Sequence, residues 1–415
     1  MRKPELLVPA SSLEVLKIAV IYGADAVYIG GEAYGLRAKA KNFSMEEIAQ
    51  GIRFAHAHGV KVYITANILA HNGDLAGVRD YFEEIAAMEP QPDALIISDP
   101  GIYLIAKEVC PGIERHISTQ ANNTNYATYL FWHGLGAKRV VSARELSLAE
   151  LREIRAHIPD ELEIETFIHG AMCISYSGRC LLSNYFTGRD ANQGACTHPC
   201  RWKYAVVEET RPNEYLPVYE NDRGTFLFNS KDLCMIGHIP ELIEAGIDSF
   251  KIEGRMKTAL YVATVARTYR RAIDDCVTSP ELYREHMPWY LDQISNCTYR
   301  QFSTGFFFGK PSEESQIYGE STYVKEYTYL GIVGGPNSEG LYRIEQRNKF
   351  SLGEQIEVMK PDGRNLAVTV RRIVDEEGND MESAPHAGQV LFVDLGQPLA
   401  LYDILRRKEE EGDRR

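Results

Sequence analysis

Four cysteines follow one another within a short, loop-rich stretch. They are Cys173, Cys180, Cys196 and Cys200, and their spacing is Cys-x6-Cys-x15-Cys-x3-Cys. Thiolates are soft ligands that suit zinc or an iron–sulfur cluster. Zinc ribbons pair their cysteines as closely spaced knuckles, a pattern that only the last two cysteines resemble. The spacing therefore favours one iron–sulfur centre, with zinc and an unliganded arrangement as the alternatives.

The other four cysteines are expected to be structural, because buried cysteine is common and packs like a small apolar side chain. They are Cys110, Cys234, Cys276 and Cys297. Cys234 is an alternate candidate ligand, since it lies close in sequence to the clustered cysteines.

No segment predicts export or a membrane span. The first apolar run, Glu5–Ala10, is too short for a signal sequence, and no later run reaches the roughly 18 apolar residues of a membrane helix. We therefore expect a cytoplasmic protein with no membrane partner, whose eight cysteines do not form disulfides. The net charge of −13 argues against a general nucleic-acid binder. A basic run from Lys251 to Arg271 leaves open a local contact or a solvated helix face.

Predicted strands and helices alternate between residue 5 and about residue 276, and they could position the cysteines. The predicted strands are Glu5–Ala10, Ala26–Gly30, Lys61–Asn67, Ala94–Ser98, Arg115–Thr119, Arg139–Ser142, Leu162–His169 and Ser249–Glu253. The predicted helices between them include Ser44–His58, Leu75–Met88, Tyr126–His133 and Ser147–His157. Eight strands alternating with helices predict an α/β protein with a (β/α)8 TIM-like barrel. The rival, a doubly wound sheet, lacks its G-x-G-x-x-G after the first strand.

One long insertion interrupts the alternation after the seventh strand. Residues 171–230 carry the four cysteines and hairpin-like runs, and a helix is predicted to follow at Leu233–Ala245. A long loop after a barrel strand lies on the carboxyl-terminal face, where this fold places its chemistry. The sequence therefore predicts that the cysteines lie at the barrel mouth.

The remainder of the chain changes in composition. We expect the barrel to cover residues 1–297, a linker 298–321, a small all-β barrel domain 322–405 and a charged, disordered tail 406–415. The predicted strands of the small domain are Tyr329–Val333, Gly340–Glu345, Gln355–Val358, Leu366–Ile373 and Gln389–Val393, separated by turn signals.

Several blocks of the chain resemble a known family. The stretch Glu165–Ser183, with the sequence ETFIHGAMCISYSGRCLLS, is similar to the signature of the peptidase U32 family, often named collagenase-like proteases. Four other blocks match as well: Glu5–Ala10, Gly23–Gly30, Arg189–Cys196 and Lys251–Arg255. The resemblance covers nearly the whole chain, and within the family it is strongest to the branch that hydroxylates the wobble uridine of tRNA.

The resemblance implies a specific chemistry. Members of this branch convert uridine to 5-hydroxyuridine with prephenate as co-substrate and without molecular oxygen, and their relatives act on a ribosomal RNA cytidine or on quinone precursors. The family also implies a [4Fe-4S] cluster. Its ligands would be Cys173, Cys180, Cys196 and Cys200, with Cys234 as the alternate fourth ligand. The expected partners are tRNA and a second subunit of the same family.

A hydroxylase of this kind needs cations for a dicarboxylate and polar groups for a base. Arginine forks bind carboxylates, although each arginine could equally form a structural ion pair. The candidates for catalysis are His169, Arg144 and Arg255. The candidates for substrate binding are Arg37, Asn67, His71, Gln120 and Arg179. Tyr176 and Tyr185 could stack on bases or pack over the cluster.

A peptidase is the alternative that the family name suggests. The chain has neither H-E-x-x-H nor G-x-S-x-G. His169 and Cys173 could form a nucleophilic pair. However, a cysteine that ligates a metal is not a free nucleophile, so this hypothesis and the metal site exclude each other.

Overall fold

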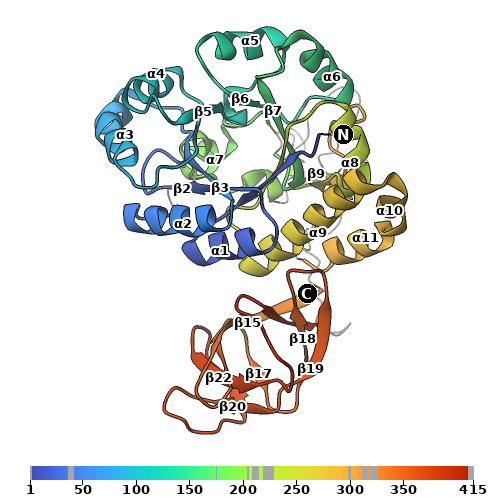
Figure 1. The fold of residues 1–415 in the computed structure, drawn as a ribbon. Coiled ribbons are helices and arrows are strands. Elements are labelled where there is room, and N and C mark those ends of the chain that lie inside the picture. Colours follow the sequence, from blue (N-terminus) through green and yellow to red (C-terminus); the bar gives the residue numbers. More distant parts are fainter. Residues whose placement is uncertain are drawn as a thin grey trace.

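The computed structural model describes residues 2–35, 42–173, 175–202, 205–207, 215–217, 229–297, 301–310, 316–317 and 326–409. Eight parallel strands close into a barrel, because β12 pairs with both β1 and β7 (Figure 1). The strands are β1 Glu5–Pro9, β2 Ala26–Gly30, β3 Lys61–Ala66, β4 Ala94–Ile97, β5 Glu114–Ile117, β6 Arg139–Val141, β7 Glu163–Gly170 and β12 Ser249–Ile252. The predicted α/β barrel is confirmed.

Helices surround the barrel and begin at caps that the sequence encodes. They are α1 Leu13–Ile21, α2 Met45–Ala57, α3 Val78–Ala86, α4 Pro100–Val109, α5 Tyr126–Gly134, α6 Leu148–His157, α8 Ile239–Glu244 and α9 Ala259–Thr278. Ser44 and Ser147 each form a capping box with the glutamate three residues later, which fixes where α2 and α6 start. Among the helices of the described residues, none combines the length and apolar content needed to cross a membrane.

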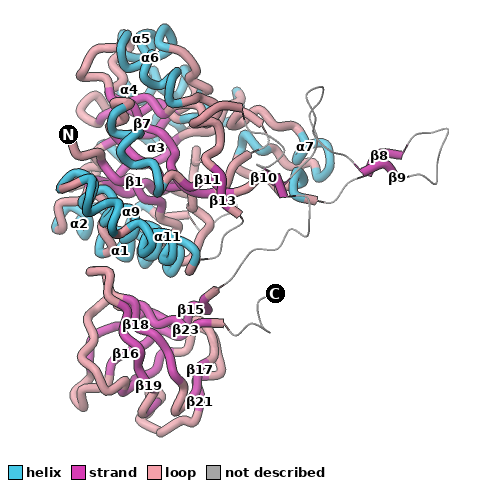
Figure 2. Tube along the Cα trace, turned by 90° about the vertical axis from the view of Figure 1, so that its right-hand side faces the viewer, coloured by secondary structure: helices cyan, strands magenta, loops and turns pink. Residues whose placement is uncertain are grey.

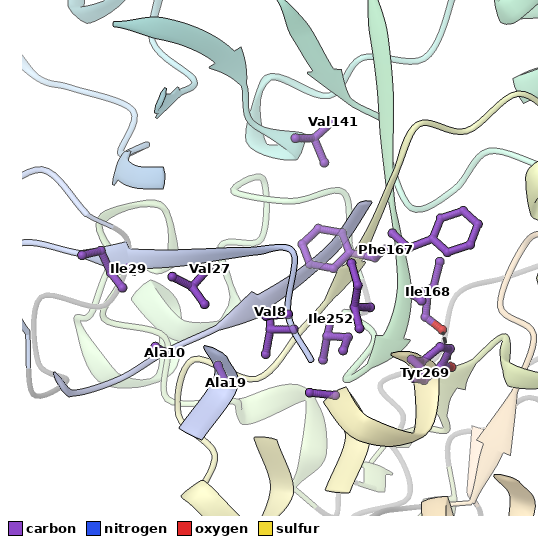
Figure 3. Packing of buried hydrophobic residues seen from close by; sticks show 14 of the residues in the cluster. Val8, Ala10, Ala19, Val27, Ile29, Val141, Phe167, Ile168, Ile252 and Tyr269 are labelled. Carbon is purple, nitrogen blue, oxygen red and sulfur yellow. Dashed lines mark hydrogen bonds between the residues drawn. The ribbon is translucent and has the colours of Figure 1, made fainter. Parts of the chain in front are cut away.

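The outer wall of the barrel is sealed by α9. Tyr269 of α9 is fully buried and donates a hydrogen bond to the carbonyl oxygen of Ile168 on β7, at 3.1 Å. Figure 3 shows this contact beside Ile252 of β12, at the junction that closes the barrel. The buried face of this 20-residue helix therefore covers the seam between the last strand and β7.

The end of β7 pairs with a strand where a helix was predicted. β11 (Asp232–Cys234) lies antiparallel to β7 and sets Cys234 opposite His169, while β13 (Phe302–Ser303) pairs with β11. The predicted helix Leu233–Ala245 is wrong in its first part, since α8 begins only at Ile239. Backbone groups at the end of β7 need hydrogen-bond partners, and β11 supplies them.

The cysteine-bearing segment contains the short helix α7 (Leu182–Thr187). Figure 2 shows α7 beyond the end of the barrel, on the side to which the strands deliver their carboxyl ends. Further along, β8 (Ala205–Val207) and β9 (Tyr215–Pro217) pair antiparallel, as the hairpin pattern predicted.

The carboxyl-terminal domain is an antiparallel sheet with its own apolar core. The sheet order is β19-β18-β23-β15-β16-β22-β20. The bounds are β15 Tyr327–Pro336, β16 Tyr342–Gln346, β18 Gln355–Met359, β19 Asn365–Thr369, β20 Arg372–Val374, β22 Val390–Asp394 and β23 Ile404–Lys408. The all-β prediction is confirmed, although Leu366–Ile373 forms two strands rather than one.

The predicted tail begins later than expected. Arg406, which was predicted to lie in the tail, lies in β23, an interior strand of the sheet, and is fully buried. Its guanidinium pairs with Glu357 and lies 4.1 Å from the ring centre of Tyr327. A charged residue that looked solvated is therefore part of the domain interior, and residues 410–415 of the predicted tail lie outside the described residues.

The two domains pack through α1, α9 and α11 (Met287–Ser295), which face the β-domain in Figure 1. Tyr22, the C-cap residue of α1, donates a hydrogen bond to the carbonyl oxygen of Met359 at 2.9 Å. Arg267 of α9 donates to the carbonyl oxygen of Lys360 at 2.8 Å. These side chains are buried, so the contact is a packed interface and not a loose tether.

Charged side chains fill the barrel near the amino ends of its strands. Arg139 on β6 forms ion pairs with Glu5, Glu163 and Glu165. Glu165 forms a second ion pair, with the ammonium group of Lys251 at 2.7 Å. Buried charges persist only when they are paired. The network therefore ties together β1, β6, β7 and β12.

Acid should weaken the fold through Glu5. Burial alone would raise the pKa of this carboxyl, but the charge and hydrogen bonds of Arg139 bring it down to about 2. A lowered carboxyl pKa gives stability that is complete above the unfolded pKa of about 4.3 and disappears as pH falls toward 2. Between about pH 6 and about pH 3, we expect the wild type to lose roughly 2 kcal/mol more unfolding free energy than Glu5→Gln.

Guanidinium denaturation at each pH measures this difference. Glu84→Gln, at an exposed position on α3, is the matched control and should follow the wild type. Parallel pH profiles for the wild type and Glu5→Gln would show that the network does not hold Glu5 ionised.

Candidate functional site at the barrel mouth

A cavity of about 120 Å³ lies at the carboxyl ends of the barrel strands, with room for several water molecules or a small organic ion. Three cationic side chains line it, Arg144, Lys251 and Arg255, together with the carboxylate of Glu253. Asn67, Ser118, Thr119 and Gln120 add amides and hydroxyls. In this fold the strand carboxyl ends carry the chemistry, so the cavity is the candidate site.

Lys251 is held at the cavity by the charge network below it. Its ammonium group donates to Glu165 at 2.7 Å and lies 4.5 Å from the ring centre of Tyr28. Lys251 is only 5% exposed, so its charge is fixed in place rather than solvated. The ion pair with Glu165 compensates the cost of burying it.

Arg255 occupies a space that a glycine leaves open. A Cβ atom on Gly30 would lie 2.0 Å from Nη2 of Arg255, so no larger residue fits at position 30 without displacing the guanidinium. Nη1 of Arg255 donates to the hydroxyl of Thr65 at 3.1 Å. β2, β3 and the loop after β12 thus position one guanidinium at the cavity.

Arg144 connects the cavity to the cysteine-bearing segment. One of its terminal nitrogens donates to the carbonyl oxygen of Ala171 at 3.0 Å, and the other lies 3.4 Å from Glu253. Its guanidinium stacks 4.0 Å from the ring centre of Phe167. Within the described residues, its buried Nε has no hydrogen-bond acceptor. Arg144 therefore keeps one donor unsatisfied beside the cavity.

Gln120 fastens the same segment to the cavity wall. It accepts a hydrogen bond from Ser177 and donates one to the carbonyl oxygen of Asn192, each at 3.4 Å. Gly178 approaches so closely that an added Cβ would lie 2.8 Å from Cγ of Gln120. The cysteine-bearing segment is therefore packed against the cavity wall at a residue that lines the cavity.

Three of the clustered cysteines influence one another. Although Cys173 is partly exposed, desolvation by its surroundings raises the pKa of its thiol, and the thiols of Cys180 and Cys196 add to this rise. The backbone N–H of Ser175 and the charge of Arg144 act in the opposite direction. Cys196 also accepts a hydrogen bond from the N–H of His198 at 3.4 Å. The net direction is a raised pKa, so these surroundings by themselves favour the thiol form of Cys173.

No group of three or more His, Cys, Asp and Glu side chains within the described residues is arranged to hold a metal ion. The donor set itself, four cysteines on one segment, suits a soft metal or an iron–sulfur cluster. Cys234, the alternate ligand, faces α9 instead, with its sulfur 3.7 Å from the hydroxyl of Tyr269. The ligand assignment remains a prediction.

His169 is not a lining residue of the cavity. The pairing of β7 with β12 shifts register between Lys251 and Ile252, and the His169 ring contacts Tyr261, Tyr269 and Phe302. Its Nδ1 lies 3.3 Å from the hydroxyl of Tyr269, and burial lowers the pKa of His169 to about 3. It is thus a neutral, buried histidine behind the barrel wall, which does not suit the predicted role in proton transfer.

The other predicted site residues divide into two groups. Asn67, Gln120, Arg144 and Arg255 come together at the cavity. His71 and Arg179 are exposed and are not among its lining residues. Arg37 lies outside the described residues. Sequence reasoning missed Lys251 as a site residue, although a lysine inside an otherwise apolar strand was a usable signal.

The fold and this mouth define a barrel protein with a cationic cavity under a cysteine-bearing segment. The profile of Peptidase family U32 matches residues 11–317, and that of the Peptidase family U32 C-terminal domain matches residues 325–406. The chain belongs to this family.

Relatives with assigned activities are similar over most of the chain. The tRNA hydroxylation protein P1 of Bacillus subtilis is 42% identical over 98% of this chain and 95% of its own length. The tRNA hydroxylation protein P of Escherichia coli is 37% identical over 98% of this chain and 97% of its own length. A 23S rRNA 5-hydroxycytidine synthase of Escherichia coli is 37% identical over 65% of this chain and 39% of its own length.

The contact between Gly178 and Gln120 gives a prediction about the cysteine-bearing segment. Gly178→Ala and Gly188→Ala both place a side chain at a positive φ, 72° and 66°, but only the first meets another residue. We expect amide exchange across residues 175–202 to be about tenfold faster in Gly178→Ala than in Gly188→Ala. Hydrogen-exchange mass spectrometry measures this.

Removing the partner should have the same effect. Gln120→Ala deletes both hydrogen bonds from this residue to the segment, so exchange across residues 175–202 should be faster than in Gly188→Ala. Equal exchange in all three variants would mean that Gln120 does not hold the segment.

Proposed function

We propose that this protein hydroxylates the wobble uridine of tRNA to 5-hydroxyuridine, with prephenate as co-substrate and an iron–sulfur cluster as cofactor. The observation that carries the proposal is the cationic cavity packed against a four-cysteine segment, in a chain that matches tRNA hydroxylation proteins along nearly its whole length. The coarser activity, hydroxylation of an RNA base, is also supported by the ribosomal RNA relative.

The cavity offers what a dicarboxylate needs. Arg144 and Arg255 both line it, and guanidinium forks bind carboxylates with two parallel hydrogen bonds. The unsatisfied Nε of Arg144 would gain an acceptor from an anionic ligand. Lys251 adds a third positive charge, held by Glu165. Prephenate carries two carboxylates and fits this set of donors.

The cysteines fit an iron–sulfur cluster by their chemistry. Cys173, Cys180, Cys196 and Cys200 would hold it, with Cys234 as the alternate fourth ligand. When bound, such a cluster supplies electron transfer or an open iron site for a substrate group. The chain's own residues orient the segment: Arg144 holds the carbonyl oxygen of Ala171, and Gln120 holds Ser177.

A uridine in tRNA must leave its stack to reach a barrel cavity, and enzymes that act on a base extrude it into a pocket. Asn67, Ser118 and Gln120 provide amides and hydroxyls for the edge of a pyrimidine. The side chains at the mouth could thus recognise both the base and the co-substrate.

The peptidase hypothesis lacks support in the geometry. It required His169 to activate Cys173, but His169 is neutral, buried and hydrogen-bonded to Tyr269. A histidine whose pKa is about 3 is a weak base near neutral pH. Proteolysis would appear as casein cleavage that depends on Cys173.

The substrate is tested by mass spectrometry of tRNA wobble nucleosides. In a strain that lacks this gene and its paralogues, we expect 5-hydroxyuridine derivatives to disappear and the wild-type gene to restore them. Arg255→Met should lower prephenate-dependent turnover of purified tRNA about 10- to 100-fold, because it removes a charge-assisted fork from the cavity.

Arg255→Lys keeps the charge and loses the fork, so we expect it to fall between Arg255→Met and the wild type. Arg152→Met, at an exposed position on α6, is the control and should match the wild type. Unchanged wobble nucleosides in the deletion strain, or casein cleavage that requires Cys173, would contradict the proposal.

The cofactor is tested by anaerobic purification. We expect a brown protein with equal amounts of iron and acid-labile sulfide, and loss of colour in Cys173→Ala, Cys180→Ala and Cys196→Ala. Comparing Cys200→Ala with Cys234→Ala identifies the fourth ligand, and Cys110→Ala, buried beside Phe82, serves as the control. A colourless protein that contains zinc would refute the cluster.

A further inference from the structure

Helix α7 buries a polar side chain and exposes aromatic ones. It buries the polar side chain of Ser183, whose hydroxyl accepts a hydrogen bond from the N–H of Thr197 at 3.1 Å. The residues around it that should prefer burial are exposed instead: Leu181 by 76%, Tyr185 by 81% and Phe186 by 42%. Because the polar face of α7 fastens it to the rest of the segment, its apolar face is presented to solvent.

The exposed side chains form a connected aromatic surface. The ring centres of Tyr185 and Phe186 are 5.1 Å apart, and those of Phe186 and Trp202 are 6.1 Å apart. Trp202 is 47% exposed. We call Tyr185, Phe186 and Trp202 the aromatic patch. Three neighbouring exposed rings are unusual on a soluble surface and indicate an interaction site.

The charges near the patch point to a polyanionic partner. Residues 171–202 contain three arginines and one aspartate, in a chain whose net charge is −13. Arg179 and Arg189 are exposed, whereas the aspartate, Asp190, accepts a hydrogen bond from Asn184 at 2.6 Å. Aromatic rings flanked by arginine are typical of surfaces that bind single-stranded nucleic acid.

The patch belongs to the segment that packs on the cavity wall. Ser177 and Asn192, on either side of α7, both hydrogen-bond to Gln120, which lines the cavity. Figure 2 shows α7 just beyond the end of the barrel. An RNA whose target base enters the cavity would therefore bring the neighbouring nucleotides close to this segment.

We propose that the aromatic patch stacks the unpaired nucleotides that flank the target base, while Arg179 and Arg189 contact their phosphates. This inference rests on the proposed function and adds the surface that holds the RNA loop open. Extruding one base breaks the stacking of its neighbours. Exposed aromatic rings can replace that stacking whatever the identity of the neighbouring bases, because every base has a π-face. Self-association of the protein through the same rings is the competing outcome.

The test measures the dissociation constant of the full-length protein for a fluorescently labelled anticodon stem-loop, with pairs of variants. Tyr185→Leu and Trp202→Leu keep apolar bulk and lose the ring, while Tyr185→Phe and Trp202→Phe keep a ring. We expect each leucine variant to bind about 5- to 100-fold more weakly and each phenylalanine variant to bind within about twofold of the wild type. Phe131→Leu, exposed on α5, is the control elsewhere on the surface.

A second readout uses Trp202 itself. Trp132 is buried and Trp289 is partly buried, so a change in tryptophan fluorescence on adding the stem-loop should vanish in Trp202→Phe. A fully paired RNA hairpin should produce little change, because it offers no unstacked bases.

The outcomes separate this inference from the proposed function. Wild-type protein that binds the stem-loop but forms no 5-hydroxyuridine would contradict the proposed function alone. Wild-type protein that hydroxylates tRNA, with equal dissociation constants for the leucine and phenylalanine variants, would overturn the stacking surface alone. If Tyr185→Leu changed the sedimentation coefficient of the free protein and left RNA affinity intact, the patch would be a self-association surface and the inference would be wrong.

Discussion

Glu165 is fully buried and holds two cations at once, Arg139 at 3.2 Å and Lys251 at 2.7 Å. Removing either partner would leave a buried charge uncompensated at a cost of several kcal/mol, so β6, β7 and β12 must keep their mutual register. The same register sets Lys251 beside Phe167, and the ring of Phe167 supports the guanidinium of Arg144. The cations at the mouth thus owe their positions to the ion pairs inside the barrel.

Arg144 also shows how the cavity and the cysteines could act together. It lines the cavity, holds the carbonyl oxygen two residues before Cys173, and lowers the pKa of that thiol against the effect of burial. Under the proposed function, an anionic co-substrate would share the charge of Arg144 with Glu253 and with the nearby sulfur. Occupancy of the cavity would then change the electrostatic field at the first cysteine.

The sequence predicts most of the barrel because its signals are local: apolar runs give strands, and capping boxes such as that at Ser44 fix the helix starts. It fails where a distant segment decides the outcome. His169 would continue the inward alternation of Glu165 and Phe167, but the register shift against β12 turns it toward Tyr269. Arg406 looks like a solvated tail residue until Glu357, 49 positions away, pairs with it. The sequence could predict that cationic residues lie at strand ends. Only the closed barrel shows that they line the same cavity.

The net charge illustrates the same difference between composition and placement. An excess of acidic residues over the whole chain argued against nucleic-acid binding, yet the segment beside the mouth has the opposite sign. Long-range repulsion between exposed charges is screened within about 10 Å at ordinary salt, so the charge near the contact matters more than the total. Exposed rings on α7 would favour aggregation if no ligand covered them. Exposed aromatic rings lower the solubility of the isolated protein. Such rings are expected where a bound substrate, and not the protein's own core, covers them.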